Sequence, residues 1–356
     1  MKILDYNPGF GTLSAGLEMI HDVEVSEVVK LSKNAQYGYN SVHKQYFPTS
    51  IETIPTFQPQ DDVDIAIFNP EFGENIGRKA KDNFFFTDFQ NCLDFLASQK
   101  PKIAIFQTET DVVPLINTAP DYIRDGFNQV SKDLMIYKLS KLGYKPYLFV
   151  VDEAEYGIPI HRSFAFYIAI PKTMDFMAPE SYFAPRKTGR FEKYRTVADA
   201  ISDLDKTGDW VEYASEPKNA YQKLLRNTNP QMVTWNSVQN IKESTKEKIS
   251  SIKQGSNNDT IVAKSRSKGY NRAKWDDICR CMDDKFYLVS SKLGDSIHPI
   301  KNRPFTIREG CRIHGLPDRL SFELSVPVRE TAKLVHNSVS PFIGMLMGLG
   351  LKLDLD

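Results

Sequence analysis

Short apolar runs alternate with helix-like segments through the first half of the chain, and this alternation constrains the fold more than any other feature. The apolar runs have the length and the β-branched or aromatic content of strands, and segments such as 87–98 and 126–142 have helical periodicity. This rhythm predicts a mostly parallel sheet covered by helices on both faces. The predicted strands are residues 2–6, 23–29, 64–68, 102–106, 147–151 and 164–170.

Beyond residue 171 the alternation gives way to a polar region rich in Pro, Asn, Ser and Lys. A chain of 356 residues is long enough for two cores, so this region predicts a smaller second domain over 172–327. From 328 to 351 the sequence returns to apolar helix and strand character, which predicts that it rejoins the first sheet. We therefore expect one domain from 1–171 and 328–356 and another from 172–327.

The composition is that of an ordinary folded protein, with 41% hydrophobic and 25% charged residues. No secretory signal opens the chain, and no stretch approaches the roughly 18 apolar residues that a membrane span needs. The four cysteines form neither a CxxC pair nor a disulfide framework. We therefore expect a cytoplasmic protein without a membrane partner or a metal site.

Charge is distributed unevenly although the formal net charge is zero. Residues 1–120 carry 9 Lys and Arg against 16 Asp and Glu, whereas residues 217–275 carry 12 against 3 and interleave them with aromatic residues. A basic segment of this kind suits DNA phosphates, and a solvated lysine-rich surface is the alternative. The candidate DNA-binding residues are Lys253, Lys264, Arg266, Lys268, Arg272 and Lys274.

A glycine-rich turn follows the first predicted strand, with Gly9, Gly11 and Gly16 ahead of a helix-like segment. Glycines at this point let the backbone approach a ligand closely, although a plain strand-to-helix turn would look the same. In open sheets of this kind, ligands bind beyond the carboxyl ends of the strands. The turn is therefore a candidate binding site.

Two stretches near the end of the chain carry a specific resemblance. Residues 303–318 read RPFTIREGCRIHGLPD and residues 336–341 read HNSVSP. They resemble the last two sequence blocks of the cytosine-C5 DNA methyltransferases, RPLTxREAARxQxFPD and GNAVPP, and the other blocks follow in the right order at 5–18, 64–73, 102–109 and 156–162. The resemblance implies a Rossmann-like class I methyltransferase domain, with a target-recognition domain in the intervening segment.

The positions that would carry methyl transfer depart from the family pattern. The family adds a Cys thiolate to cytosine C6, and the resemblance places Phe72 at that position. Gln107 stands where the family has a Glu that protonates the ring, and Glu109 shares its strand face two residues on. Arg162 matches the first Arg of the QxRxR block and is a candidate base or phosphate contact, or a solvated strand-end arginine. Phe72 is expected to plug the pocket.

The residues that would hold S-adenosylmethionine depart from the pattern as well. The resemblance places Asn7 where the family has an aromatic residue, Lys30 where it has a ribose-binding carboxylate and Ser50 where it has an Asp. Lys30 offers only donors to the ribose hydroxyls, and Glu27 is the alternative match. We expect no bound cofactor, with S-adenosylmethionine as the alternative. The degenerate pocket consists of Asn7, Gly9, Gly11, Lys30, Ser50 and Asn337.

Together these departures predict a catalytically inactive homologue that binds double-stranded DNA or regulates a DNA-modification or restriction process, with a protein partner as a further expectation. The alternative is a DNA-base-modifying enzyme, either a residual methyltransferase or one with a different cofactor. A third hypothesis is a structural or inhibitory protein whose acidic N-terminal half meets its partner.

Overall fold

The computed structural model describes residues 1–20, 22–43, 45–47, 62–70, 84–116, 133–227, 231–256, 270–289 and 295–352. Among these residues the central sheet has six strands in the order β2-β1-β3-β4-β6-β5. All six predicted strands are confirmed, with bounds that differ by a few residues at most. They are β1 (Lys2–Tyr6), β2 (Glu24–Val29), β3 (Ile65–Phe68), β4 (Ile103–Glu109), β5 (Lys145–Asp152) and β6 (Ser163–Ile170).

Strands β1 to β4 pair in parallel, and β6 runs antiparallel to its neighbours β4 and β5. The carboxyl ends of β1 to β4 therefore meet at one edge of the sheet, together with the beginning of β6. Glu109 at the end of β4 pairs with Phe164 near the start of β6. This edge is where the glycine turn and the predicted base-binding residues come together.

Two separate sets of apolar side chains cover the two faces of the sheet. Because successive strand residues point to opposite faces, Ile65 and Ile67 join one core while Ala66 and Phe68 join the other. The first core includes residues from α1 (Thr12–Leu17), α2 (Lys33–Val42) and α12 (Pro341–Leu351), and the second from α3 (Phe84–Gln99), α4 (Val112–Ile116) and α6 (Leu134–Lys141). The three-layer α/β fold that the sequence predicts is confirmed.

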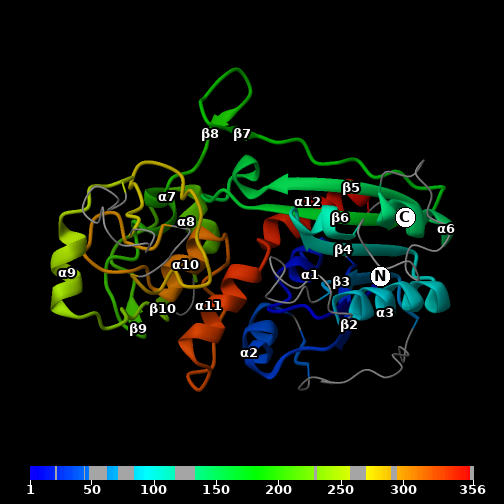
Figure 1. Ribbon diagram of the computed structural model, residues 1–356, viewed down its shortest axis with the longest axis horizontal. Coiled ribbons are helices and arrows are strands. Elements are labelled where there is room, and N and C mark those ends of the chain that lie inside the picture. The colour runs from blue at the N-terminus through cyan, green and yellow to red at the C-terminus, as the bar shows by residue number, and fades with distance from the viewer. Residues whose placement is uncertain are drawn as a thin grey trace.

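A smaller lobe lies beside the sheet, with α11 (Val328–Asn337) running between the two (Figure 1). Buried residues of this lobe, such as Val233 and Phe286, belong to the same continuous core as one face of the sheet. The two lobes are therefore packed together. The lobe contains α7 (Val197–Ile201), α8 (Ala220–Leu225), α9 (Glu243–Ser250), α10 (Ile307–Ile313), and the antiparallel pair β9 (Trp210–Glu212) and β10 (Met232–Thr234).

The last apolar segment corrects one expectation, because α11 and α12 are both helices and no strand from 328–351 joins the sheet. Helix α12 packs instead on α1, where Gly344 faces Gly16. A Cβ at Gly344 would stand 2.2 Å from the carbonyl oxygen of Leu13. The glycines allow the two helix backbones to approach closely, which a sequence of Leu, Met and Gly does not distinguish from a buried strand.

The segment Val328–Leu351 is also long and apolar enough to cross a membrane by length and composition, with a mean hydropathy of 1.3 in its most apolar window. The chain departs from helical geometry at Ser338, where α11 ends, and α12 begins at Pro341. In this window 61% of the residues are buried inside the protein. The segment therefore behaves as core helices of the folded chain.

Candidate functional site

Two asparagine side chains join the ends of β1 and β3 at the carboxyl edge of the sheet. Asn7 Nδ2 donates to the carbonyl of Asn69 at 2.7 Å, and Asn69 Nδ2 donates to the carbonyl of Asn7 at 3.2 Å. The backbone N–H of Asn7 also donates to the carbonyl of Val29, at the end of β2. These hydrogen bonds fix the ends of three strands relative to one another. In open sheets of this kind, ligands bind just beyond such strand ends.

The glycine turn predicted between β1 and α1 is confirmed. Gly9 and Gly11 have φ values of +57° and +64°, in the left-handed region that glycine occupies at little cost. A Cβ at Gly11 would stand 2.2 Å from the ring of Tyr39, so the turn packs directly on α2. At Gly9 no atom of the described residues lies within 4 Å of the position of a Cβ.

A buried carboxyl group lies beneath the turn. Asp5, on β1, accepts hydrogen bonds from the hydroxyl of Ser14 and, at 3.2 Å, from the hydroxyl of Tyr39. Burial raises the pKa of Asp5 to about 6, while the two hydroxyl donors and the nearby His43 oppose that shift. The group therefore ties β1 to α1 and α2 at the base of the site.

His43 fastens the same turn from the end of α2. Its Nδ1 lies 2.8 Å from a carboxylate oxygen of Glu18, and its Nε2 lies 3.0 Å from the carbonyl oxygen of Gly11. Both ring nitrogens of His43 are therefore in hydrogen-bonding contact within the fold. The ring stacks on Tyr39 with centroids 4.0 Å apart. The turn is held by a built polar network, which the sequence did not predict.

Lys30 is the first residue after β2, whereas Glu27 lies inside the strand and pairs with Leu4. Of the two candidates, Lys30 is therefore the residue that directly follows the strand. The Lys30 ammonium pairs with Asp88 of α3 at 3.2 Å and lies 5.7 Å from the centroid of the Tyr6 ring. The Tyr6 hydroxyl donates to the same carboxylate. This ion pair bridges β2 and α3 at the carboxyl edge of the sheet.

Gln107 and Glu109 end β4 on the same face of the strand, as the alternation of side chains requires. Gln107 is buried with 8% of its surface exposed, and Glu109 is exposed at the strand end. Burial lowers the pKa of Arg162, and the charge of Glu109 is one of the neighbouring charges that oppose this shift. The structure thus brings a carboxylate close to the arginine of the base-binding block.

Arg162 stands just before β6 and points toward the beginning of α12. Its Nη1 donates to the carbonyl of Ser338 at 2.8 Å, and its guanidinium lies 4.3 Å from the centroid of the Phe164 ring. Burial lowers the pKa of Arg162, and the charge of Glu153 opposes that shift. The side chain is partly buried and engaged with the fold. It is thus more than the solvated strand-end arginine that the sequence left open.

The three-residue turn 338–340, between α11 and α12, is where the separate sequence blocks meet. Thr12 donates to the carbonyl of Val339 at 2.6 Å, and the N–H of Ser340 donates to Glu153 at 2.9 Å. The hydroxyl of Ser340 donates to the carbonyl of Gly315 at 3.3 Å. With the bond from Arg162, the glycine turn, the base-binding block and the 303–318 block all contact this turn. Asn337, which precedes it, is exposed.

A cluster of buried and partly buried polar side chains adjoins this turn, and sequence reasoning missed it. Glu153, Arg162, His314 and His336 come from four separate segments, and the two imidazole rings lie edge to face at 6.4 Å. Among the described residues, one buried polar atom of each lacks a hydrogen-bond partner: Glu153 Oε2, Arg162 Nη2, His314 Nε2 and His336 Nδ1. Buried polar atoms are normally paired, so four atoms without a partner in one cluster are unusual.

Electrostatics in the cluster follow from its burial. Burial raises the pKa of Glu153 to about 7 and lowers the pKa of His336 to about 3, and it lowers the pKa of His314 well below its usual value. The positive charge of Arg162 lowers both histidine pKa values further. One signal was available in the sequence, since His314 and His336 stand where the family patterns have Gln and Gly.

The 303–318 block organises the smaller lobe through buried ion pairs. Thr306 caps α10 through a reciprocal capping box with Glu309, which also accepts two hydrogen bonds from Arg303, at 2.8 and 2.7 Å. These hydrogen bonds hold the pKa of the Glu309 carboxyl below its usual value against the effect of burial. Near this pair, burial lowers the pKa of His298 to about 4. The block is thus fixed at the start of its helix.

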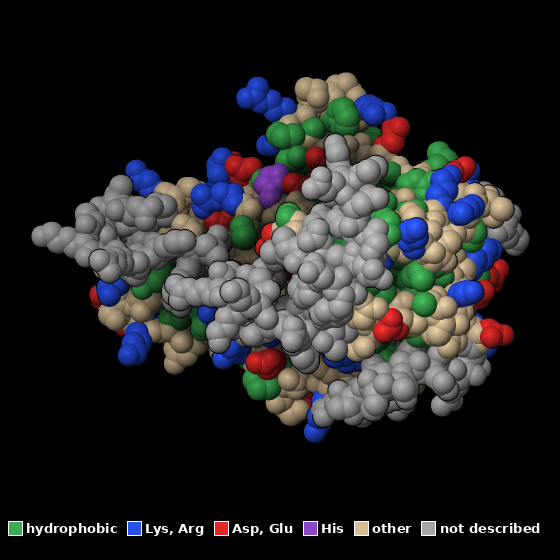
Figure 2. All heavy atoms as spheres, turned by 45° about the vertical axis from the view of Figure 1, so that its right-hand side comes forward, with side chains coloured by type: hydrophobic (Ala, Val, Ile, Leu, Met, Phe, Trp, Pro, Cys, Tyr) green, Lys and Arg blue, Asp and Glu red, His purple; other side chains and the backbone are tan. Residues whose placement is uncertain are grey.

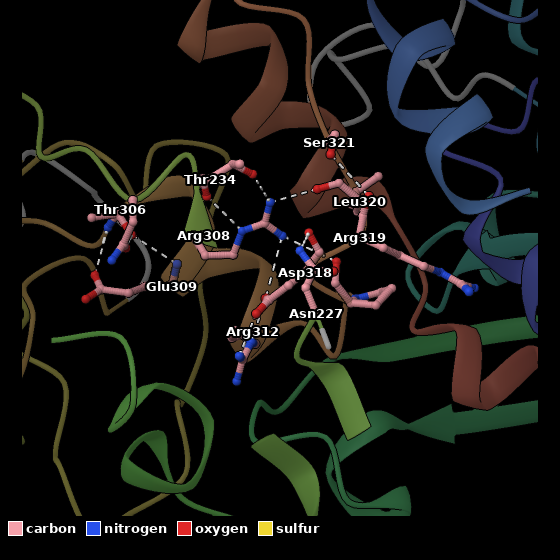
Figure 3. A network of polar contacts seen from close by, with 12 residues as sticks. Asn227, Thr234, Thr306, Arg308, Glu309, Arg312, Asp318, Arg319, Leu320 and Ser321 are labelled. Atoms are coloured by element: carbon pink, nitrogen blue, oxygen red, sulfur yellow. Dashed lines mark hydrogen bonds and ion pairs between the residues drawn. The ribbon is translucent and has the colours of Figure 1, made fainter. Parts of the chain in front are cut away.

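The second half of the same network joins α10 to the rest of the lobe (Figure 3). Arg308 donates to the backbone carbonyls of Thr234 and Leu320, at 3.0 and 2.7 Å. Arg312 forms two hydrogen bonds with Asp318, at 2.7 and 2.6 Å, and a longer contact with Asp203. All these side chains are buried. The strongest part of the family resemblance therefore has a structural role in this chain.

The predicted DNA-binding residues divide into three groups. Lys253 and Lys274 are exposed, and Lys274 pairs with Asp277 at 3.2 Å. Arg272 is buried, and its guanidinium donates to backbone carbonyls that include those of Ile249 and His298, at 2.6 and 2.9 Å. The expected DNA contact of Arg272 is corrected accordingly, because the side chain is buried and both of its terminal nitrogens donate within the fold. Lys264, Arg266 and Lys268 lie outside the described residues.

Two other predicted positions, Ser50 and Phe72, also lie outside the described residues. The proposed packing of Phe72 is therefore still a prediction. Within the described part of the chain, no group of three or more His, Cys, Asp or Glu side chains is arranged to hold a metal ion.

Comparison with known proteins agrees with this geometry. Similar structures include a DNA modification methyltransferase encoded within an Escherichia coli prophage (TM-score 0.68, 16% identity, 99% of both chains) and Dnmt2 methyltransferase of Schizosaccharomyces pombe (TM-score 0.59, 16% identity, 99% of both chains). The fold is thus that of the class I methyltransferases.

The sequence itself defines the family. The model of the C-5 cytosine-specific DNA methylases matches residues 125–346, which is more than half of the chain. Type II methyltransferase M.DdeI of Desulfomicrobium norvegicum is 25% identical over 91% of this chain and 80% of its own length. The chain belongs to the C-5 cytosine-specific DNA methylase family.

Proposed function

We propose that this chain is a catalytically inactive member of its family that binds double-stranded DNA or regulates a DNA-modification or restriction process. The observation that carries the proposal is Phe72, which stands where the resemblance requires a cysteine. A phenyl ring has no nucleophilic atom to add to cytosine C6, so the covalent step that activates C5 is lost.

The residue that follows β2 supports the same proposal. S-adenosylmethionine needs an acceptor for its ribose hydroxyls after β2, and Lys30 supplies only donors. Its ammonium is paired with Asp88 and packed over Tyr6, so it fits the fold better than it fits the cofactor. We therefore expect no bound cofactor and assign no reaction step to one.

Gln107 adds a third departure from the chemistry. Its neutral amide can donate to or accept from a base but cannot deliver a carboxyl proton to the ring. Since Gln107 lies buried at the end of β4, it is placed to contact a base without protonating it. In this proposal, residues 1–171 and 328–356 form the methyltransferase-like domain, and residues 172–327 the target-recognition-like domain of a cytoplasmic protein.

The alternative is a DNA-base-modifying enzyme, and one observation favours it. Glu109 is exposed at the carboxyl edge, on the face of Gln107, and acts electrostatically on Arg162. A carboxylate within electrostatic reach of an arginine could hold and protonate a base. The open backbone at Gly9 leaves room for a ligand at the same edge.

Duplex binding and methyl transfer should be measured on the same protein. We expect salt-dependent binding of labelled duplex DNA by fluorescence anisotropy, unchanged by S-adenosylmethionine, and no transfer of labelled methyl groups to DNA. The triple variant K264Q/R266Q/K268Q should bind more weakly, with a smaller salt dependence, than the matched control K100Q/K102Q/K141Q. Methyl transfer, or a covalent adduct with DNA containing 5-fluorocytosine, would establish the enzyme instead.

A further inference from the structure

A positively charged segment projects from the body of the protein between the two lobes (Figure 1). Residues 180–195, which we call the basic arm, include β7 (Phe183–Ala184) and β8 (Glu192–Lys193) and carry five Lys and Arg against two Glu. Every residue from 185 to 190 is exposed. Figure 2 shows Lys and Arg side chains on both sides of this projection, at the top of the molecule. The exposed cations of the arm are Arg186, Lys187, Arg190 and Lys193.

The base of the arm is firmly attached. Arg195 lies between two aromatic rings, 5.0 Å from the centroid of Phe183 and 4.9 Å from that of Tyr221. Its guanidinium donates to the carbonyl of Gly157 at 2.8 Å. A Cβ at Gly157 would stand 2.6 Å from the Phe183 ring, so the arm packs tightly on that glycine. The fifth cation is therefore an anchor, and the other four are left for a partner.

The attachment point is the block that carries Arg162. The N–H of Tyr182 donates to the carbonyl of Glu155 at 3.1 Å, in the short helix η1 (Glu153–Tyr156). Near the other end of the arm, the ring of Tyr194 contacts the exposed ring of His161 edge to face at 5.3 Å. Because Arg162 is the next residue, the arm is rooted beside the carboxyl edge of the sheet.

The outer part of the arm is ordered by its own contacts. Thr188 and Phe191 exchange backbone hydrogen bonds of 3.2 and 2.9 Å, and Gly189 at the tip has φ +54°. Lys187 pairs with Glu192 at 3.2 Å, and Arg190 pairs with Glu180 at 2.8 Å. The Lys187 and Arg190 side chains remain 70% and 66% exposed. Exposed ion pairs are weak, so phosphate groups can compete for both cations.

We propose that the basic arm binds the phosphate backbone of duplex DNA beside the carboxyl edge of the sheet. This inference rests on the proposed function in one respect, namely that the protein binds DNA. Four cations on a preordered, exposed projection provide sequence-independent contacts, and their anchorage fixes the position of the duplex relative to Arg162. The contacts are separate from those expected of segment 217–275.

The quadruple variant R186Q/K187Q/R190Q/K193Q tests the arm directly. Its control, K100Q/K102Q/K141Q/K172Q, removes the same charge from exposed residues at the opposite edge of the sheet. With labelled duplex DNA in a salt series, we expect the arm variant to bind at least tenfold more weakly at low salt. Its plot of log Kd against log salt should be shallower by about 0.9 per lost phosphate contact, up to about 3.5. The control should change affinity less than threefold.

A second variant guards against a folding defect. E180Q/E192Q releases Arg190 and Lys187 from their ion pairs and should tighten DNA binding at low salt, which a misfolded protein would not do. Unfolding midpoints of all variants, followed by circular dichroism, should match that of the parent protein. Tighter binding of E180Q/E192Q together with weaker binding of the quadruple variant establishes the arm as a DNA contact.

The outcomes separate this inference from the proposed function. If the parent binds duplex DNA and the arm variant binds equally well, the arm is not a DNA contact although the protein still binds DNA. If the parent fails to bind duplex DNA at low salt, both the arm's role and the DNA-binding function are wrong. Arm-dependent binding that is stronger for an RNA hairpin than for duplex DNA would also overturn the assignment.

Discussion

Glu153 accepts a hydrogen bond at 2.9 Å from the backbone N–H of Ser340, which is 187 positions further along the chain. Arg162 donates to the carbonyl of Ser338 in the same turn, so Glu153 and Arg162 together hold both ends of it. The turn leads into α12, which packs on α1 behind the glycine turn. The candidate site therefore depends on a long-range contact between buried polar groups.

Glu153→Gln should change how stability depends on pH. The folded protein holds a proton on Glu153 up to a pKa of about 7, against about 4.5 when unfolded, so the folded state binds more protons between these values. Stability therefore falls as pH rises from about 4.5 to 7, by roughly 3 kcal/mol, and the neutral Gln lacks this contribution. Urea unfolding at several pH values should show the difference between parent and variant growing across this window. An unchanged difference would mean that Glu153 does not titrate there.

Arg312→Met should destabilise the protein by about 3–5 kcal/mol, because it removes the guanidinium that donates two hydrogen bonds to the buried carboxylate of Asp318 and pairs with Asp203. Arg319→Met, at an exposed position seven residues on, should change stability by about 0.5 kcal/mol or less. Unfolding midpoints in urea compare the two. If the double change R312M/D318L is as damaging as R312M alone, the loss does not come from the unpaired carboxylate.

Gly344→Ala should separate α12 from α1. The added Cβ would meet the Leu13 carbonyl oxygen at 2.2 Å, and backbone cannot move aside cheaply, so we expect a loss of about 3 kcal/mol or more. Gly348→Ala is the matched control within the same helix, because its Cβ would meet the flexible end of Ile20. Thermal unfolding should rank G344A well below G348A, and equal midpoints would contradict the close approach.

Gly11→Ala should destabilise the glycine turn more than Gly9→Ala. Both residues have positive φ, which costs an L-residue about 1–2 kcal/mol, but only the Cβ at Gly11 would collide with Tyr39. We expect G9A to lose about 1 kcal/mol and G11A at least twice as much by chemical denaturation. Similar losses for both would show that backbone conformation alone, without the contact to α2, decides the glycine at position 11.

Local pattern was sufficient for the sheet but not for the last segment. Each strand of the sheet reveals itself through a short apolar run, since every buried strand has to shield its own backbone and side chains. The 328–351 segment is apolar whether it forms a helix or a strand, so the sequence predicted both characters there. The structure has two helices, and Gly344 of the second lies against Gly16 of α1. The strand part of the expectation was therefore wrong.

Charge pattern predicted surface roles less well. Arg272 is one cation among many in its segment, and nothing local distinguishes it from Lys274. The fold places the Arg272 guanidinium among backbone carbonyls, whereas Lys274 stays at the surface. Likewise, the tertiary structure places Lys30 against Asp88 of α3, a contact that sequence spacing could not predict.

The sequence by itself determined the order of strands and helices, the family and the residue types at the positions of the reaction, because these depend on local periodicity and on the chemistry of individual side chains. Only the tertiary structure decided which distant residues share one environment. Glu153, Arg162, His314 and His336 form one buried polar cluster because four segments converge there, and burial then sets the protonation of Glu153 and the two histidines. Such convergence is a property of the packed chain and is not recorded in the spacing of its residues.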